Sequence, residues 1–266
     1  MPTTVSITRL MGNTALPADT PRLSLIMPCY NEDQAVGYSI PRLLGAFRTA
    51  RINLQLITVD NGSTDRTRKL LTEFAANNPE VSLCALNVNQ GYGNGILQGI
   101  PLCSGEWLGF VHADGQVDPE DVVRLFEAAA ATDGNVLAKV CRRFRMDGWK
   151  RKIVSGGYNV LVRMLWPGLP SADINGSPKL LKRDHALALN LQSKDWFLDP
   201  EIMIKAHRLG LRVLELNVFA RMRSNGLSHV RVGTCWEFLV NLLKARLTPS
   251  FRATDSARSH VEQASR

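Results

Sequence analysis

The amino-acid sequence predicts an α/β domain with a doubly wound, mostly parallel sheet and flanking helices. Four short apolar segments before residue 112 have the composition of buried strands, and segments with helical spacing of apolar residues separate them. The connections between these segments are short, and strands that alternate with helices in this way favour a parallel sheet. With 266 residues, of which 45% are hydrophobic, the chain is long enough to bury one large core.

The first half of the chain supplies most of the predicted elements. They are strands at 23–27, 53–60, 81–86 and 107–111, helices at 40–47 and 69–76, and a glycine-rich loop at 87–95 that precedes a further helix. Asp65 is a candidate N-cap of the second helix, and Asp118 is a candidate N-cap of a helix that begins at Pro119.

Beyond about residue 134 the alternation of strands and helices stops. The elements expected there are an amphipathic helix over 153–166, a turn-rich insert over 172–179, a helix over 199–206, a strand over 211–218 and an amphipathic helix over 235–247. For the whole chain we expect a flexible leader over 1–22, one domain over 23–232, a C-terminal helix over 233–247 and a disordered tail over 248–266. The C-terminal helix is expected to pack on the domain, with a membrane interface as the alternative.

The composition indicates which binding partners and which redox compartment to expect. A net charge of +8 and a pI near 9.5 favour anionic partners, either nucleic acid, phosphorylated small molecules or an anionic membrane surface. Five scattered cysteines without a Cys-x-x-Cys pair argue against a disulfide framework and a structural zinc site, and they favour a reducing compartment. No apolar run reaches roughly 18 residues, the length that spans a bilayer. We therefore expect a protein that is soluble or peripheral to a membrane.

Polar side chains follow each of the four predicted strands. Tyr30 and Glu32 follow the first, Asp60 ends the second, the glycine-rich loop follows the third, and His112, Asp114 and Gln116 follow the fourth. Because the carboxyl ends of parallel strands meet at one edge of a sheet, where ligands bind in open α/β folds, we expect a ligand site there. A carboxylate and an amide at this edge suit a hard divalent cation, whereas the alternative for Asp114 is that it only completes a turn.

A basic stretch follows this presumed site. It contains Trp149 among the cations Lys139, Arg142, Arg143, Arg145, Lys150, Arg151 and Lys152. Two interpretations stay open, a solvated surface and a site for an anionic substrate or lipid head group.

Five motifs, taken together, resemble the inverting family 2 glycosyltransferases of the GT-A fold. They are Ile26-Met-Pro-Cys-Tyr-Asn-Glu32, Val59-Asp-Asn-Gly-Ser-Thr-Asp65, Gly91-Tyr-Gly-Asn-Gly95, Ala113-Asp-Gly-Gln116 and Arg221-Met-Arg-Ser-Asn-Gly-Leu-Ser228. The resemblance covers roughly residues 22–232 and is closest to the branch of dolichol-phosphate mannose synthases and bacterial undecaprenyl-phosphate sugar transferases. It implies a transferase that moves a sugar from a UDP- or GDP-sugar to an acceptor, with a polyprenyl phosphate as the expected acceptor and with Mg²⁺ or Mn²⁺ as the cofactor.

The resemblance also implies roles for individual residues. The donor nucleotide site would comprise Pro28, Tyr30, Glu32, Asp60, Gly91, Ala113 and Asp114, the metal ligands would be Asp114 and Gln116, and the acceptor phosphate would meet Arg142, Arg143, Arg151 and Ser155. Arg223 matches an arginine that contacts phosphate in the closed site, and Asp173 matches a carboxylate proposed as a base, so Asp114, Arg223 and Asp173 are the catalytic candidates. A lipid phosphate is already ionised at neutral pH and hardly needs a base, whereas a sugar hydroxyl acceptor requires one.

Two positions depart from the family pattern. His112 stands in place of the first aspartate of the metal motif, and Asn61 in place of the second aspartate of Val-Asp-Asp-Gly-Ser. Metal binding should therefore depend more on Asp114 and the donor diphosphate. His112 either ligates a softer ion such as Mn²⁺ or hydrogen-bonds a neighbour, and we favour the second.

The resemblance also implies a cellular location, and two other functions stay open as alternatives. We expect a cytoplasmic protein at the cytoplasmic face of the membrane, with peripheral membrane contact, a membrane partner subunit as an option, and no nucleic-acid partner. The missing aspartate at position 112 keeps open a nucleotide-sugar binding protein with weakened catalysis. Gly91, Gly93 and Gly95 suggest a nicotinamide-dependent oxidoreductase, but their spacing and their place after the third strand argue against it.

Overall fold

The computed structural model describes residues 20–145, 173–221 and parts of 157–171, together with Leu242, without the side chains of 143–145. Residues 1–19 of the expected leader and the whole expected tail fall outside the described residues, as does the C-terminal helix apart from Leu242. Pro21 and Arg22, at the end of the expected leader, are hydrogen-bonded to Glu106, Asn53 and Trp107. Leu242 is helical and fully buried in the core, which agrees with packing on the domain at that one residue. No helix among the described residues has the length and apolar character needed to cross a membrane.

The described residues form a seven-stranded sheet with the order β3-β2-β1-β4-β6-β5-β7. Its strands are β1 (Leu23–Cys29), β2 (Leu54–Asn61), β3 (Val81–Leu86), β4 (Trp107–Phe110), β5 (Val136–Arg145), β6 (Lys179–Lys182) and β7 (Arg212–Ala220). Neighbouring strands from β3 to β4 are parallel, β6 is antiparallel to both β4 and β5, and β5 is parallel to β7. The mostly parallel sheet predicted from the sequence is confirmed.

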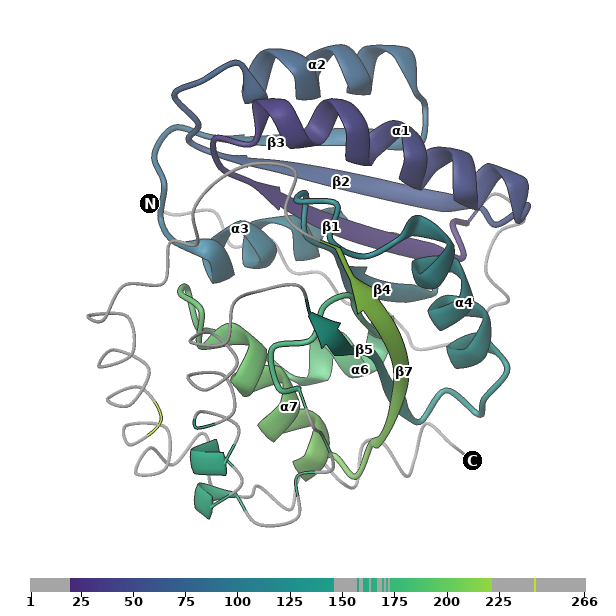
Figure 1. The fold of residues 1–266 in the computed structure, drawn as a ribbon. Coiled ribbons are helices and arrows are strands. Elements are labelled where there is room, and N and C mark those ends of the chain that lie inside the picture. Colours follow the sequence, from purple (N-terminus) through teal and green to yellow (C-terminus); the bar gives the residue numbers. More distant parts are fainter. Residues whose placement is uncertain are drawn as a thin grey trace, which may run out of the picture.

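Helices cover both faces of this sheet, as Figure 1 shows. They are α1 (Asp33–Thr49), α2 (Thr67–Asn77), α3 (Tyr92–Gly99), α4 (Pro119–Ala130), α6 (Arg183–Ala188) and α7 (Leu198–Arg208), with a 3₁₀ turn at Ile100–Leu102. Side chains of α1, α2 and α4 belong to one hydrophobic cluster, and those of α3, α6 and α7 belong to the other. The sheet is therefore doubly wound.

Helix α1 illustrates how the pattern of apolar residues fixes the packing. Val36, Ile40, Leu43, Leu44 and Phe47 recur three and four residues apart, so they lie on one stripe of the helix, and all are buried against the sheet. Burial of each such side chain contributes about 1.5 to 3 kcal/mol to stability. This packing fixes the position of α1 relative to β1 and β2. It thereby also fixes where the loops at the carboxyl ends of these two strands begin.

The four strands predicted in the first half are confirmed within two residues at each end, and β7 is confirmed within two as well. Strands β5 and β6 were not predicted. Each carries a fully buried lysine, Lys139 on β5 and Lys179 on β6, and these charges interrupt the apolar pattern that marks a strand. Neither interpretation of the basic stretch describes Lys139, because its side chain lies inside the protein.

The two expected N-caps need correction. The N-cap of α2 is Arg66 rather than Asp65, although the Asp65 carboxylate accepts a hydrogen bond from the backbone N–H of Thr67 in the first turn. Asp118 does occupy the N-cap position of α4, but its side chain makes no capping hydrogen bond. It pairs instead with Arg42 and Arg221, because both guanidinium groups approach it from neighbouring elements.

Candidate active site

The sheet register brings the four polar strand ends to one edge. Cys29 at the end of β1 lies opposite Asp60 on β2, and Asp60 lies opposite Ala85 on β3. On the other side of β1, Phe110 at the end of β4 pairs with Ile26. The residues that follow these strands therefore emerge at the same carboxyl edge, where ligands bind in open α/β sheets.

Backbone and side-chain hydrogen bonds join the first two strand ends. The Asn31 side chain accepts from the backbone N–H of Thr64 at 2.8 Å, and the backbone N–H of Asn31 donates to the Ser63 hydroxyl at 3.1 Å. The backbone N–H of Glu32 donates to the Thr67 hydroxyl at 2.8 Å. Beside this pair of loops, Tyr30 is 41% exposed and offers an aromatic face to solvent.

Asp60 is fully buried, and its carboxylate is used within the protein. One oxygen accepts from the backbone N–H of Ser63 at 3.0 Å, and the other accepts from Arg68 Nε at 2.5 Å. Arg68 also donates to the carbonyl of Leu86, so it connects the ends of β2 and β3. In this structure Asp60 shapes the edge by fixing two loops.

Asn61 accounts for one of the two departures from the family pattern. Its side-chain amide donates to the carbonyl of Gly91 at 2.8 Å and to the Asn89 side chain at 3.1 Å. An ionised aspartate has no proton to donate to a carbonyl, so it could not make these bonds. The asparagine therefore suits the loop after β3, which it holds against the end of β2.

The glycine run after β3 packs against the backbone of the loop before α7. A Cβ atom on Gly91 would lie 2.3 Å from the carbonyl oxygen of Lys194, and one on Gly93 would lie 2.3 Å from that of Ser193. The backbone N–H of Asn94 donates to the Lys194 carbonyl at 2.9 Å. These glycines allow two backbones to approach closely, a role that sequence reasoning did not assign to them.

A stack of three aromatic rings lies at the same edge. The rings of Tyr92 and Trp196 are 4.4 Å apart between centroids and nearly parallel, and the rings of Tyr92 and His112 are 5.3 Å apart. Burial raises the pKa of Tyr92 well above its ordinary value, and the nearby Asp199 and Asp114 carboxylates raise it further while Arg142 opposes them. The stack was not predicted, although Tyr92 and Trp196 are aromatic residues within polar loop segments, which is a signal that could have found it.

The predicted metal ligands lie after β4. Asp114 and Gln116 are both buried, and the Asp114 carboxylate accepts from the backbone N–H of Gln116 at 3.1 Å. The Gln116 amide donates to the carbonyl of Arg221 at 3.1 Å, which leaves its oxygen as the atom suited to a cation. Within the described parts of the chain, no three His, Cys, Asp or Glu side chains gather as a metal site. The donor set fits a hard cation that takes most of its ligands from a bound diphosphate.

Arg142 and Asp173 form a two-pronged ion pair. Arg142 donates through Nε to one carboxylate oxygen at 2.8 Å and through a terminal nitrogen to the other at 3.0 Å, and it also reaches the carbonyl of Asn175 at 2.8 Å. Burial alone raises the pKa of Asp173, but the hydrogen bonds and charge of Arg142, with the charge of Lys139, hold that pKa well below its ordinary value. A carboxylate of this kind is a weak base, and its charge is paired with that of the Arg142 guanidinium, which stays protonated.

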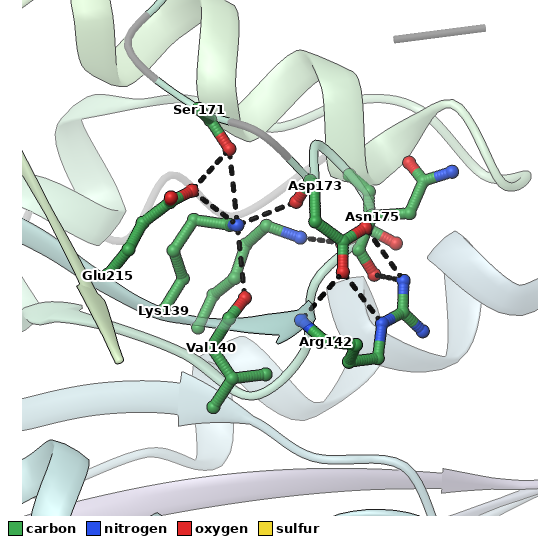
Figure 2. A network of polar contacts seen from close by, with 9 residues as sticks. Lys139, Val140, Arg142, Ser171, Asp173, Asn175 and Glu215 are labelled. Carbon is green, nitrogen blue, oxygen red and sulfur yellow. Dashed lines mark hydrogen bonds and ion pairs between the residues drawn. The ribbon is translucent and has the colours of Figure 1, made fainter. Parts of the chain in front are cut away.

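Two buried lysines flank this pair. Lys179 pairs with Asp199, and burial, only partly offset by Asp199, lowers the pKa of Lys179 to about 8. Lys139 lies among Val140, Ser171, Asp173 and Glu215, as Figure 2 shows. Lys139, Lys179, Asp199 and Glu215 were not among the predicted site residues. The side chain of Arg143, together with Arg151, Ser155 and Arg223, falls outside what the structure describes.

The comparison with protein families identifies the chain. Residues 24–187 match the model of glycosyl transferase family 2. The chain belongs to this family. It is therefore a glycosyltransferase, and the nicotinamide-dependent alternative has no support.

Several relatives share the name undecaprenyl-phosphate 4-deoxy-4-formamido-L-arabinose transferase. The protein of Pectobacterium carotovorum subsp. carotovorum is 30% identical over 237 residues, which are 88% of this chain and 70% of that protein. The protein of Proteus mirabilis is 32% identical over 143 residues, which are 53% of this chain and 43% of that protein.

Solved structures support the fold. Glucosyl-3-phosphoglycerate synthase from Mycobacterium tuberculosis superposes with a TM-score of 0.65 at 18% identity, covering 89% of this chain and 82% of the synthase. One structure of that synthase contains Mn²⁺, UDP-glucose and phosphoglyceric acid. The likeness confirms the GT-A fold that the sequence motifs implied.

Proposed function

We propose that this glycosyltransferase moves a sugar from a UDP-sugar to a polyprenyl phosphate, with a divalent cation and with inversion at the transferred carbon. The observation that carries the proposal is the sheet register, in which Phe110 at the end of β4 and Lys139 on β5 both pair with Lys179 of β6. The segments that follow, which carry Asp114 and Arg142, therefore extend past the same carboxyl edge. A donor diphosphate at Asp114 and an acceptor phosphate near Arg142 would thus lie on neighbouring parts of one site. The relatives named as undecaprenyl-phosphate transferases support the acceptor.

The donor end is assigned to the ends of the first four strands. Tyr30, with its exposed face, would stack on the base, and Glu32 would lie on the ribose side of the pocket. Asp60, whose buried carboxylate binds Ser63 and Arg68, would position the loops around the ribose. Pro28, Gly91 and Ala113 would supply backbone along the nucleotide. UDP is preferred over GDP because the M. tuberculosis synthase, which shares the fold, binds UDP and UDP-glucose.

Asp114 and the Gln116 oxygen would hold the cation, and Mn²⁺ in the synthase of the same fold supports that ion over Mg²⁺. A bound divalent cation would offset the negative charge that builds on the leaving diphosphate. We assign His112 to the aromatic stack, since its ring lies against Tyr92. Arg223, which lies outside the described residues, is proposed as a second positive charge on the diphosphate.

The acceptor end needs no strong base. A lipid phosphate is ionised at neutral pH, and the low pKa of Asp173 makes its carboxylate unsuited to accept a proton. We assign Asp173 to orienting Arg142, and Arg142, Arg143, Arg151 and Ser155 to the acceptor phosphate. Attack by that phosphate from the side opposite the diphosphate gives one displacement and hence inversion.

The acceptor also determines where the enzyme works. A polyprenyl phosphate stays in the bilayer, so the enzyme must reach its head group at the membrane surface. The net charge of +8 would attract the chain to the anionic lipids of the cytoplasmic leaflet. We therefore propose a peripheral contact at the cytoplasmic face, as part of cell-envelope glycan synthesis.

A transfer assay tests the proposal. Purified protein would be incubated with labelled UDP-sugars and Mn²⁺, and separately with polyprenyl phosphate, a soluble phosphorylated acceptor or a free sugar. Label in the lipid fraction is the expected result. Label only in the soluble phosphate or the free sugar would reject the lipid acceptor.

A second candidate function is donor binding without turnover, favoured by histidine at position 112 in place of the family aspartate. Calorimetric titration with the same UDP-sugars separates it from catalysis. Tight donor binding together with no transfer to any of the three acceptors would establish that candidate in place of the enzyme.

A further inference from the structure

Lys139 is a fully enclosed cation near the proposed acceptor end. Its side chain has no exposed surface, although it belongs to the basic stretch that the sequence shows from Lys139 onward. The ammonium group donates to Glu215 Oε1 at 3.0 Å, to the carbonyl of Asp173 at 2.6 Å and to the carbonyl of Val140 at 3.1 Å, and it lies 3.3 Å from the Ser171 hydroxyl. An ammonium has three protons, so these oxygens account for all of its hydrogen bonding.

The charges around this lysine are balanced. Three cations and three anions face one another in pairs, namely Lys139 with Glu215, Arg142 with Asp173 and Lys179 with Asp199. A buried charge is tolerated only when it is paired and hydrogen-bonded, so the positions of these groups depend on one another. Lys139 contacts two segments beyond its own strand. One is β7, through Glu215, and the other is the turn at 173–176 together with Ser171.

That turn is held to the sheet at several points. The Ser171 hydroxyl donates to Glu215 at 2.5 Å, and the Asp173 carbonyl accepts from both Lys139 and the backbone N–H of Gly176, the latter at 2.9 Å. Gly176 lies against β5 so closely that a Cβ atom there would be 2.1 Å from the Val140 carbonyl oxygen. The turn therefore has little freedom to shift while Lys139 is charged and in place.

Two cationic side chains therefore bind Asp173, each at a different group. Its backbone carbonyl is bound by Lys139 and its carboxylate by Arg142, as Figure 2 shows. The orientation of the Arg142 guanidinium depends on the carboxylate, and the position of the carboxylate depends on the turn. The buried charge of Lys139 therefore acts on Arg142 indirectly, through the turn and the Asp173 carboxylate.

We propose that Lys139, through its contacts with Ser171, Asp173 and Glu215, is a positioning residue that sets the turn at 173–176 and thereby the orientation of Arg142 for the acceptor. The inference rests on the proposed function, since it assigns Arg142 to the acceptor phosphate. Because the Lys139 side chain is fully enclosed, we assign it no direct contact with the substrate.

The test replaces the buried pair by apolar side chains of similar size, Lys139→Met with Glu215→Leu, because such replacements often preserve folding. The matched control makes the same two changes in a surface pair, Lys182→Met with Glu106→Leu, whose charged atoms are 3.6 Å apart. We expect the buried variant to raise the KM for the acceptor about tenfold, with the KM for the donor changed less than about twofold. The control should leave both unchanged.

Amide hydrogen exchange gives a readout that does not need turnover. The backbone N–H of Gly176, which is bonded within the turn, should exchange faster in the buried variant and at the wild-type rate in the control. Unchanged exchange at Gly176, or an unchanged acceptor KM in a folded variant, would overturn the inference. If the double variant does not fold, Ser171→Ala removes a single hydroxyl from the same network and should shift both readouts in the same direction.

The failure of the proposed function is distinguishable from the failure of this inference. Wild-type protein that transfers only to another acceptor would reject the lipid acceptor, and the KM comparison would then be made with the acceptor it does use. Wild-type protein that transfers to none would leave the exchange measurement to decide whether Lys139 holds the turn.

Discussion

The Arg142 guanidinium donates to both carboxylate oxygens of Asp173, at 2.8 Å and 3.0 Å. Both side chains are largely enclosed, with exposed fractions of 11% and 9%. Two parallel hydrogen bonds fix the plane of the guanidinium as well as its position. The ion pair helps to distinguish two possible roles of Asp173, a catalytic base and a group that orients Arg142. A base would have to release Arg142 in order to accept a proton, whereas an orienting group would keep its hydrogen bonds to Arg142.

The first prediction concerns Asp173→Asn. The amide retains one oxygen for the guanidinium but loses the charge, so Arg142 should be held less firmly. We expect the KM for the acceptor to rise about tenfold with kcat reduced less than about fivefold, in steady-state transfer assays. A fall in kcat of about 1,000-fold with an unchanged KM would instead identify Asp173 as a base.

The second prediction concerns acid stability. The pKa of Asp173 is lower in the folded protein than its ordinary value of 3.8, so below about pH 4 the unfolded chain binds more protons at this group than the folded chain. The stability from Asp173 is fully present above pH 3.8 and is lost as the pH falls toward the folded pKa. Urea unfolding between pH 4.5 and pH 2 should therefore show a steeper loss of unfolding free energy for the wild type than for Asp173→Asn. Equal slopes for the two proteins would contradict the assignment.

The third prediction concerns Asp114→Asn. The change keeps the size and one oxygen of the side chain but removes the charge that a hard cation prefers. Loss of several kcal/mol of charge stabilisation corresponds to a fall in Mn²⁺-dependent transfer of about 100-fold or more. Near-normal turnover of this variant at saturating Mn²⁺ would remove Asp114 from the metal site. Asp121→Asn on α4, where the side chain is 18% exposed and pairs with Arg124, serves as the matched control.

The fourth prediction uses a pair of glycines. A Cβ atom on Gly93 would lie 2.3 Å from the Ser193 carbonyl and 2.7 Å from that of Asp195, so Gly93→Ala must displace the loop that carries Trp196. In contrast, Gly45 on α1 has open space around its Cβ position. We expect Gly93→Ala to destabilise the protein by about 2 kcal/mol and to lower donor affinity. Gly45→Ala should stabilise it by about 0.5 to 1 kcal/mol in the same urea titrations. Equal free energies of unfolding for the two variants would show that the loop moves aside for the added methyl group at little cost.

The sequence predicted the half of the fold in which strand and helix patterns are undisturbed. Strands β1 to β4 are short apolar runs with turn residues at their ends, and such runs are recognisable without a partner. Strands β5 and β6 were missed because Lys139 and Lys179 lie inside them. A buried lysine is exceptional, and only the carboxylates of Glu215 and Asp199, far away in the sequence, make it tolerable.

The same reasoning explains what was missed in the site. Residue types alone indicated Asp114, Gln116 and Asp60 at the carboxyl edge, since strand ends could be located. They did not show that the Asp60 carboxylate is bound by Arg68, or that Asn61 holds the glycine loop. Those facts depend on distances between loops, and a pattern along one chain does not contain them.

The pairing of β5 with β7 has a consequence for how the protein folds. Val136 on β5 pairs with Arg212 on β7, so these two distant parts of the chain must meet before the two strands can form hydrogen bonds. Contacts between residues so far apart in the sequence form slowly. The first four strands are joined by short crossovers and can assemble while the rest of the chain is still being synthesised. Glu215, which binds both Ser171 and Lys139 beside the turn at 173–176, belongs to β7 and takes its place only when β7 pairs. The donor side of the edge is thus expected to take shape early in folding, and the acceptor side last.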